Sequence, residues 1–225
     1  MYPRFLLLFL TLGLVSCASV SIEPGTQHTT QHKPSLVYVM PFNTTHGEFN
    51  VDRTGADLTA FQQNLQLMMK TAIVTDLSTR LVPAVAGTKA DWSSQKNAWI
   101  VEGDFVLVNQ GSRLLRGVVG FGAGGTKLET RVRVYDLRGT SGTPFLTFST
   151  TGGSNAEPGA ILGATMDPLT LAIGAVSGVA HGCSEDTKRT ARMITAELSD
   201  YMYHHGWITQ DKWIEPKTVG GEDLW

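Results

Sequence analysis

The chain has 225 residues, a net charge of −2 and 42% hydrophobic residues. Its length and hydrophobic content fit one packed domain, and the nearly neutral charge gives no general attraction to nucleic acid or to anionic lipid. Glycine is abundant, with 24 residues. Because it gathers in residues 111–125 and 152–182, it marks local architecture and not a flexible polymer.

The first residues predict export. Arg4 precedes an apolar run over residues 5–15, and Ser16 and Cys17 follow. A positive charge, a short apolar run and a small residue before the cleavage point are typical of a signal peptide, here residues 1–16. The run is shorter than the roughly 20 apolar residues that span a bilayer.

The sequence Leu14-Val15-Ser16-Cys17 also resembles the bacterial lipobox, in which the cysteine becomes acylated. Several acyl chains on Cys17 would anchor the protein stably to a membrane. Ser19 is not the aspartate of the inner-membrane retention signal, so we expect the outer membrane, with the protein facing the periplasm. The alternative is an ordinary signal peptide that carries a cysteine near its cleavage point.

Residues 17–35 are polar and contain Pro24 and Gly25, which predicts a tether between lipid and domain. A short apolar run at 36–40 predicts the first strand. From Asp57 to about Arg80, apolar residues recur at helical spacing. The residues on this stripe are Leu58, Phe61, Leu65, Met68, Ala72 and Leu77.

Strands are predicted next at 98–108, at 128–137 and at 144–151. In the second of these, Leu128, Thr130, Val132 and Val134 alternate with polar residues, which indicates one wet face. Successive strands between about 98 and 151 favour an antiparallel meander. A last helix is expected from Ser184 to Gly206, with Cys183 as a buried thiol; intermolecular pairing and a reactive thiol are its alternatives.

These elements predict a single α+β domain over residues 36–207 with a C-terminal tail at 208–225. Its sheet would be antiparallel, mixed at most, with about five strands, and two longer helices would flank it. Residues 158–182 are apolar and rich in glycine, and Gly174, Gly178 and Gly182 recur every four residues. Such a ridge permits close helix approach. The segment either packs inside the domain or contacts a membrane or a neighbouring subunit.

Residues 111–125, GSRLLRGVVGFGAGG, invite a phosphate-loop interpretation. A dinucleotide or phosphate loop is followed by a helix, whereas the residues from Lys127 onward alternate as a strand. The pattern therefore favours a bend between strands, in which glycine allows sharp twist or close backbone contact.

No motif for nucleophilic catalysis, paired carboxylates or metal binding occurs in the sequence. The six histidines are scattered, and no three of them combine with a carboxylate at a convincing spacing. We therefore expect a protein that is not an enzyme and that uses neither a metal nor a cofactor. A nucleotide-binding or small-ligand-binding domain is the least favoured alternative.

The chain resembles the bacterial domain-of-unknown-function family 4410. The resemblance spans about residues 36–207 and rests on Gly103 and on the pattern GSRxxRxxxGFGAG. In this chain the pattern comprises Gly111, Ser112, Arg113, Arg116, Gly120, Phe121, Gly122 and Gly124. The family implies a small α/β domain on secreted or lipid-anchored proteins, without an established activity or catalytic residues. The layout is also similar, at the level of the fold, to the curli-secretion lipoprotein and to TolB N-terminal domains.

Together these features predict an envelope lipoprotein with a structural or interaction role. Its expected partners are the membrane, through the acyl chains on Cys17, and an envelope protein or further copies of the chain, but not nucleic acid. The alternative is an oligomeric or membrane-contacting assembly or secretion accessory that uses residues 158–182.

Overall fold

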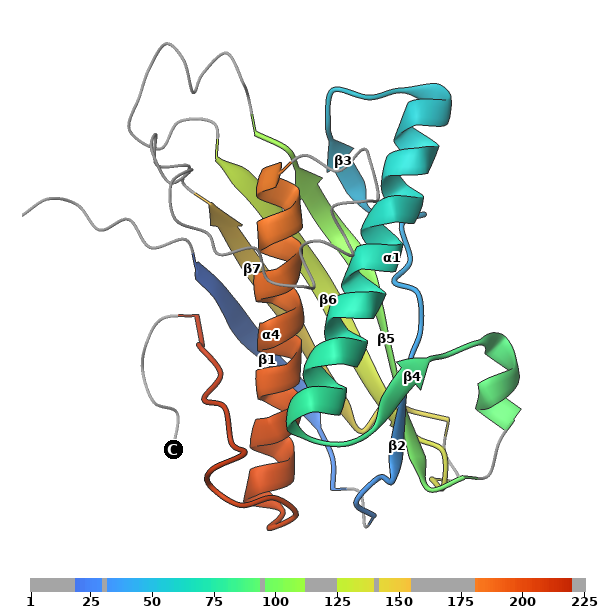
Figure 1. The fold of residues 1–225 in the computed structure, drawn as a ribbon, viewed down its shortest axis with the longest axis vertical. Coiled ribbons are helices and arrows are strands. Elements are labelled where there is room, and N and C mark those ends of the chain that lie inside the picture. The colour runs from blue at the N-terminus through green and yellow to red at the C-terminus, as the bar shows by residue number, and fades with distance from the viewer. Residues whose placement is uncertain are drawn as a thin grey trace, which may run out of the picture.

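A computed structural model describes residues 19–29, 32–93, 96–111, 125–139, 142–154 and 181–219. They form one seven-stranded sheet and two long helices, so the predicted α+β class with two longer helices is confirmed (Figure 1). In chain order the elements are β1 (Ser19–Gln27), β2 (Leu36–Val39), β3 (Glu48–Asn50), α1 (Gly55–Arg80), β4 (Ala84–Ala86), the 3-10 helix η1 (Lys89–Ser93), β5 (Ala98–Asn109), β6 (Thr126–Asp136), β7 (Leu146–Ser154) and α4 (His181–His204).

The sheet is mixed, with the strand order β1-β7-β6-β5-β2-β4 and with β3 paired to β5. Strands β5, β6, β7 and β1 are antiparallel, which confirms the predicted meander. Strands β2, β3 and β4 pair in parallel. The prediction of about five strands is wrong, since the described part of the sheet has seven. Strands β3 and β4 are three residues long, which is too short for a periodic pattern to show in the sequence.

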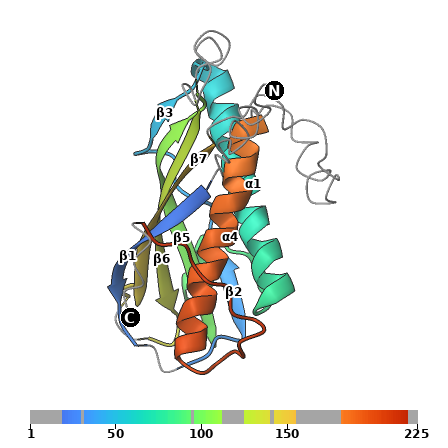
Figure 2. The ribbon, with the colours of Figure 1, turned by 90° about the vertical axis from the view of Figure 1, so that its left-hand side faces the viewer.

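Helix α1 connects β2 to the parallel strand β4, as a crossover must. Both helices lie on one face of the sheet and pack against each other (Figure 2). The core between the layers combines apolar residues of α1 and α4 with every second residue of the central strands. It includes Phe61, Leu65, Met69, Trp99, Val101, Val132, Val134, Phe148, Ile194 and Tyr201. No helix in the described part of the chain is long and apolar enough to cross a membrane.

The prediction of a polar tether is wrong for residues 19–27, which form β1 at one edge of the sheet. Only Val20 and Ile22 of this strand are buried in the core. The outer edge of β1 is occupied at Ile22, whose amide donates to the carbonyl of Lys217 (2.6 Å) and whose carbonyl accepts from the amide of Val219 (3.0 Å).

The predicted C-terminal tail, residues 208–225, is partly fixed to the domain. Ile208 and Ile214 pack against the core, and the backbone of Ile214 exchanges hydrogen bonds with the hydroxyl of Ser199 on α4. Residues 220–225 lie outside the described residues. Helix α4 begins at His181, three residues before the predicted start at Ser184, and Cys183 is buried in it, as predicted.

Gly103 on β5 makes room for a neighbouring ring. A Cβ atom at this position would collide with the ring of Phe42, which is fully buried where the chain leaves β2. No side chain fits there without displacing Phe42, since real Cβ atoms do not approach so closely. Gly103 thus lets Phe42 pack against β5 where the chain after β2 runs alongside that strand, beside the site described next.

Candidate functional site: a charged cluster on the open face of the sheet

Strand β6 divides its side chains between the two faces of the sheet. Its buried residues face the helices, whereas Glu129, Arg131, Arg133 and Tyr135 are on the opposite face and are exposed or half-buried. This division confirms the predicted alternation. Neither of the two long helices, α1 and α4, covers this second face, which we call the open face (Figure 2).

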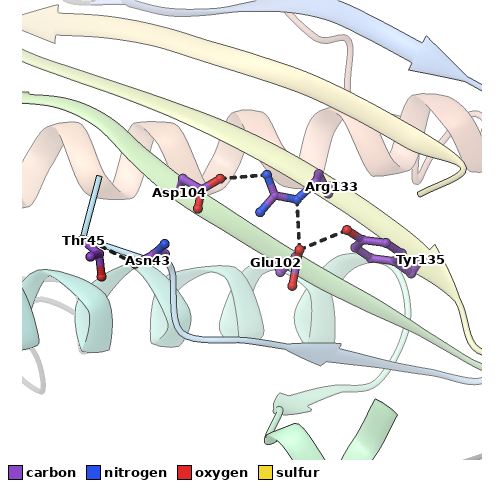
Figure 3. A network of polar contacts seen from close by, with 6 residues as sticks. All are labelled: Asn43, Thr45, Glu102, Asp104, Arg133 and Tyr135. Atoms are coloured by element: carbon purple, nitrogen blue, oxygen red, sulfur yellow. Dashed lines mark hydrogen bonds and ion pairs between the residues drawn. The ribbon is translucent and has the colours of Figure 1, made fainter. Parts of the chain in front are cut away.

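Four side chains on the open face form a connected network, the sheet-face cluster: Glu102 and Asp104 from β5, and Arg133 and Tyr135 from β6 (Figure 3). Arg133 donates from Nε to Glu102 Oε1 (2.9 Å) and from Nη1 to Asp104 Oδ2 (2.7 Å). The hydroxyl of Tyr135 donates to the same Glu102 Oε1 (3.0 Å). Because Glu102 lies directly opposite Arg133 in the register, the sheet itself positions the ion pair.

The cluster is partly shielded from water, with 24–28% of the three charged side chains exposed. Burial opposes the charge on Arg133, but hydrogen bonds and charge attraction from Asp104 and Glu102 outweigh it and raise the pKa of Arg133 above its ordinary value. Burial and the negative charge of Glu102 raise the pKa of Tyr135. The guanidinium therefore stays charged and the phenol stays protonated at physiological pH.

The chain after β2 passes beside the cluster. Asn43 forms a parallel bridge with Asp104: its amide donates to the carbonyl of Gly103 (2.7 Å), and its carbonyl accepts from the amide of Phe105 (2.9 Å). The side-chain oxygen of Asn43 accepts from the amide of Thr45 (2.9 Å), which fixes a turn at the border of the cluster (Figure 3).

An apolar patch adjoins the other side of the cluster. It consists of buried residues from β2, from the residue after β2 and from β5, namely Tyr38, Met40, Ala98 and Ile100, with Tyr135 packed against them. Trp92 of η1 meets Tyr135 edge to face, with ring centroids 4.7 Å apart, and remains 37% exposed. The open face thus joins fixed charges to an accessible aromatic pair.

The two carboxylates of the cluster, Glu102 and Asp104, each have one oxygen engaged within the cluster. Arg133 and Tyr135 occupy the carboxylate oxygens Glu102 Oε1 and Asp104 Oδ2. The second oxygen of each carboxylate accepts no hydrogen bond from the residues that the structure describes, so each can accept one from a bound group. Within those same residues, no group of three or more His, Cys, Asp or Glu side chains could hold a metal ion.

Most of the site residues predicted from the sequence lie outside the described residues. These are Cys17, Ser112, Arg113, Arg116, Gly120, Phe121, Gly122, Gly124, Gly174 and Gly178. Gly111 is described: its φ of 73° lies in the left-handed region, and its amide donates to Asn109 Oδ1 (2.8 Å). Gly182 is the second residue of α4. The described glycines do not join the sheet-face cluster.

The cluster itself is missing from the sequence-based predictions. Its signal was two acids in an otherwise apolar strand, at Glu102 and Asp104, and an alternation that placed Arg133 and Tyr135 on the wet face. Pairing them required the register of β5 against β6, which shifts between Phe105 and Leu107. A single sequence does not supply that register.

No match to the chain was found among curated protein sequences. The chain resembles a number of solved structures at low identity, among them three bacterial proteins. The PelC dodecamer of Paraburkholderia phytofirmans is 7% identical, with a TM-score of 0.37 over 76% of this chain and 96% of that one. The hypothetical protein CT253 of Chlamydia trachomatis is 13% identical, with a TM-score of 0.46 over 75% and 98%. The lipoprotein GNA1162 of Neisseria meningitidis is 12% identical, with a TM-score of 0.35 over 64% and 95%.

Similarity as low as this carries no information on function or assembly. The match to a family model is more informative, because it covers most of the domain and includes both strands of the sheet-face cluster. A domain of unknown function, DUF4410, matches residues 37–175, more than half of the chain. The protein belongs to the DUF4410 family.

Proposed function

We propose that this protein is an acyl-anchored protein of the bacterial cell envelope that binds another envelope protein and catalyses no reaction. The lipobox-like sequence that ends at Cys17 supports the anchor. The organisation of the open face supports the binding role, and it is the observation on which the proposal rests.

Arg, Tyr and Trp are the residue types that dominate binding energy at protein interfaces, and Arg133, Tyr135 and Trp92 lie together on the open face. Glu102 and the pairing of β5 with β6 fix the side chains of Arg133 and Tyr135 in advance. A partner that docks there has few side chains to order, which lowers the entropic cost of binding. Around this centre, exposed Arg131 and half-buried Glu129 form a polar rim.

The anchor is tested by metabolic labelling with a radioactive or clickable palmitate. The parent protein is expected to incorporate the label and to fractionate with the outer membrane, whereas Cys17→Ser is expected to lose both properties. Cys183→Ser is the matched control, because this second cysteine is buried in α4 and should leave labelling unchanged. A parent protein without label, or a Cys17→Ser variant that retains it, would contradict the anchor.

The binding role is tested by charge reversal at two exposed arginines. Arg131 lies on the open face in β6, and Arg192 lies on α4. Partners captured by cross-linking from envelope extracts should be reduced for Arg131→Glu and unchanged for Arg192→Glu. Equal capture by both variants, at equal protein levels, would exclude the open face as the docking surface.

A second candidate function is self-assembly through residues 158–182, for which the recurrence of Gly174, Gly178 and Gly182 is the supporting pattern. Light scattering of the detergent-solubilised protein measures this directly. A monomer whose mass is unaffected by Gly178→Leu would argue against it and leave the open-face proposal standing.

A further inference from the structure

Strand β1 starts almost at the proposed anchor. Ser19 is its first residue, and only Ala18 separates Ser19 from Cys17. An extended chain spans at most about 3.6 Å per residue, so the backbone of Cys17 lies within about 7 Å of Ser19. An acylated Cys17 therefore leaves almost no spacer between the lipid and the folded sheet.

The strand cannot readily detach to serve as that spacer. It pairs with β7 along Ser19–Pro24, and Val20 and Ile22 are buried at 3% and 0% exposure. Burial of aliphatic side chains stabilises the folded state, so both positions oppose detachment of β1. On its outer edge Ile22 also holds the backbone of Lys217 and Val219. Freeing β1 would expose both apolar side chains, break the ladder with β7 and break the bridge to the C-terminal segment.

The register shows which end of the domain the anchor reaches. Ser19 pairs with Gly153, and Gly153 pairs with Lys127 across the next strand. Lys127 in turn pairs with Asn109 near the end of β5. The start of β1, the end of β7 and the start of β6 thus lie at one end of the strands, at the upper left of Figure 1. We call this the Ser19 end.

We propose that the Ser19 end of the sheet lies against the lipid headgroups of the membrane, and that the turn between β6 and β7 points away from it. This inference rests on the acylation of Cys17 in the proposed function. The short connection holds the Ser19 end at the bilayer surface, and the packing of β1 transmits that orientation to the whole sheet. The open face then stands roughly upright on the membrane, accessible from the side to a partner.

Two exposed positions measure the orientation. Lys127 lies level with Ser19, and Arg138 lies in the turn after β6. Asp136, at the other end of β6, lies nine positions after Lys127, which is about 30 Å at the rise of an antiparallel strand. The full-length acylated protein would carry Lys127→Cys or Arg138→Cys with a donor dye, in phosphatidylethanolamine/phosphatidylglycerol vesicles that contain a headgroup-labelled acceptor lipid. Cys183 is 3% exposed and does not compete for the dye.

Energy transfer to the acceptor lipid is expected to be several-fold more efficient from position 127 than from position 138. A flexible Gly/Ser insert of about 20 residues between Ala18 and Ser19 has a mean span of about 25 Å and should bring the two values close together. Equal transfer from both positions in the protein without the insert overturns the inference.

The anchor and the orientation fail in different ways. Mass spectrometry of the N-terminal peptide reports acylation, and flotation with the vesicles reports attachment. If acylation or flotation is absent, the proposed anchor fails and the orientation fails with it. If both are present and the two dyes report equal transfer, only the orientation fails.

Discussion

Glu197 on α4 gives a test of the helix layer in which the direction and the size of the effect both follow from the structure. Burial, assisted by the negative charge of Asp200, raises the pKa of Glu197 from 4.5 to about 7. The native state therefore keeps a proton between these two pH values that the unfolded chain releases. Because the native state binds more protons in this window, the free energy of unfolding falls as the pH rises through it.

A rise in pKa from 4.5 to about 7 corresponds to about 3 kcal/mol of lost stability once the carboxylate is ionised. Glu197→Gln removes the titrating group and keeps its shape. The variant should match the parent protein near pH 4 and exceed its free energy of unfolding by up to about 3 kcal/mol at pH 8. Asp200 is unchanged in the variant and keeps its hydrogen bond from Trp213 Nε1 (2.9 Å).

The assay is urea unfolding of the purified protein, followed by circular dichroism at several pH values between 4 and 8.5. Glu215→Gln serves as the matched control, because Glu215 is exposed. Its profile should run parallel to that of the parent protein. A parallel profile for Glu197→Gln as well would refute the reasoning, since the cost of the buried carboxylate would then be absent.

Four further substitutions test the packing of the sheet and the C-terminal segment. Gly103→Ala places a Cβ atom against the ring of Phe42 and should lower the free energy of unfolding by about 1–3 kcal/mol in urea titrations, with no loss if Phe42 can move freely. Thr130→Val and Thr150→Val each break the hydrogen bond between two buried hydroxyls (2.7 Å), and each should lower the free energy of unfolding by about 1–2 kcal/mol. The double variant should lose less than the sum of the two single losses, and strict additivity would contradict the pairing. Ser199→Ala removes the hydroxyl that donates to the carbonyl of Ile214 and accepts from its amide. Amide hydrogen exchange across residues 207–219 should therefore become faster, and an unchanged rate would show that this contact does not fix the segment.

The sequence predicted the helices and the central strands because their periodic patterns are strong. The stripe of α1 from Phe61 to Leu77 and the alternation of β6 both reflect burial of one side against the same core. Those patterns report which side of an element is buried, but not which strand lies beside it. The parallel pairing of β2 with β4 and β5 was therefore missed.

Strand β1 shows why edge elements are hard to predict. Only Val20 and Ile22 face the core, so two apolar residues carry its whole signal. Proline usually interrupts a strand because it has no amide hydrogen to donate. In β1, however, the amide of Ile22, two residues before Pro24, points away from β7 toward Lys217. The missing amide of Pro24 therefore falls on the outer edge, where the pairing with β7 loses no bond.

The sheet-face cluster was out of reach for a related reason. Glu102 and Arg133 are 31 residues apart, and their contact depends on how β5 and β6 align across the intervening chain. The glycine-rich residues 111–125 drew attention in the sequence because unusual composition is visible there. The candidate site is instead formed by ordinary residue types on two paired strands.

The most direct test of the central claim is site-specific photo-cross-linking in the cell envelope. A photoreactive amino acid at Ser149, on the open face of β7 opposite Arg131, should form a discrete adduct with one envelope protein. The same amino acid at Leu67, which is exposed on α1, should not. An adduct from position 67 with none from position 149 would contradict the assignment of the open face as the binding surface.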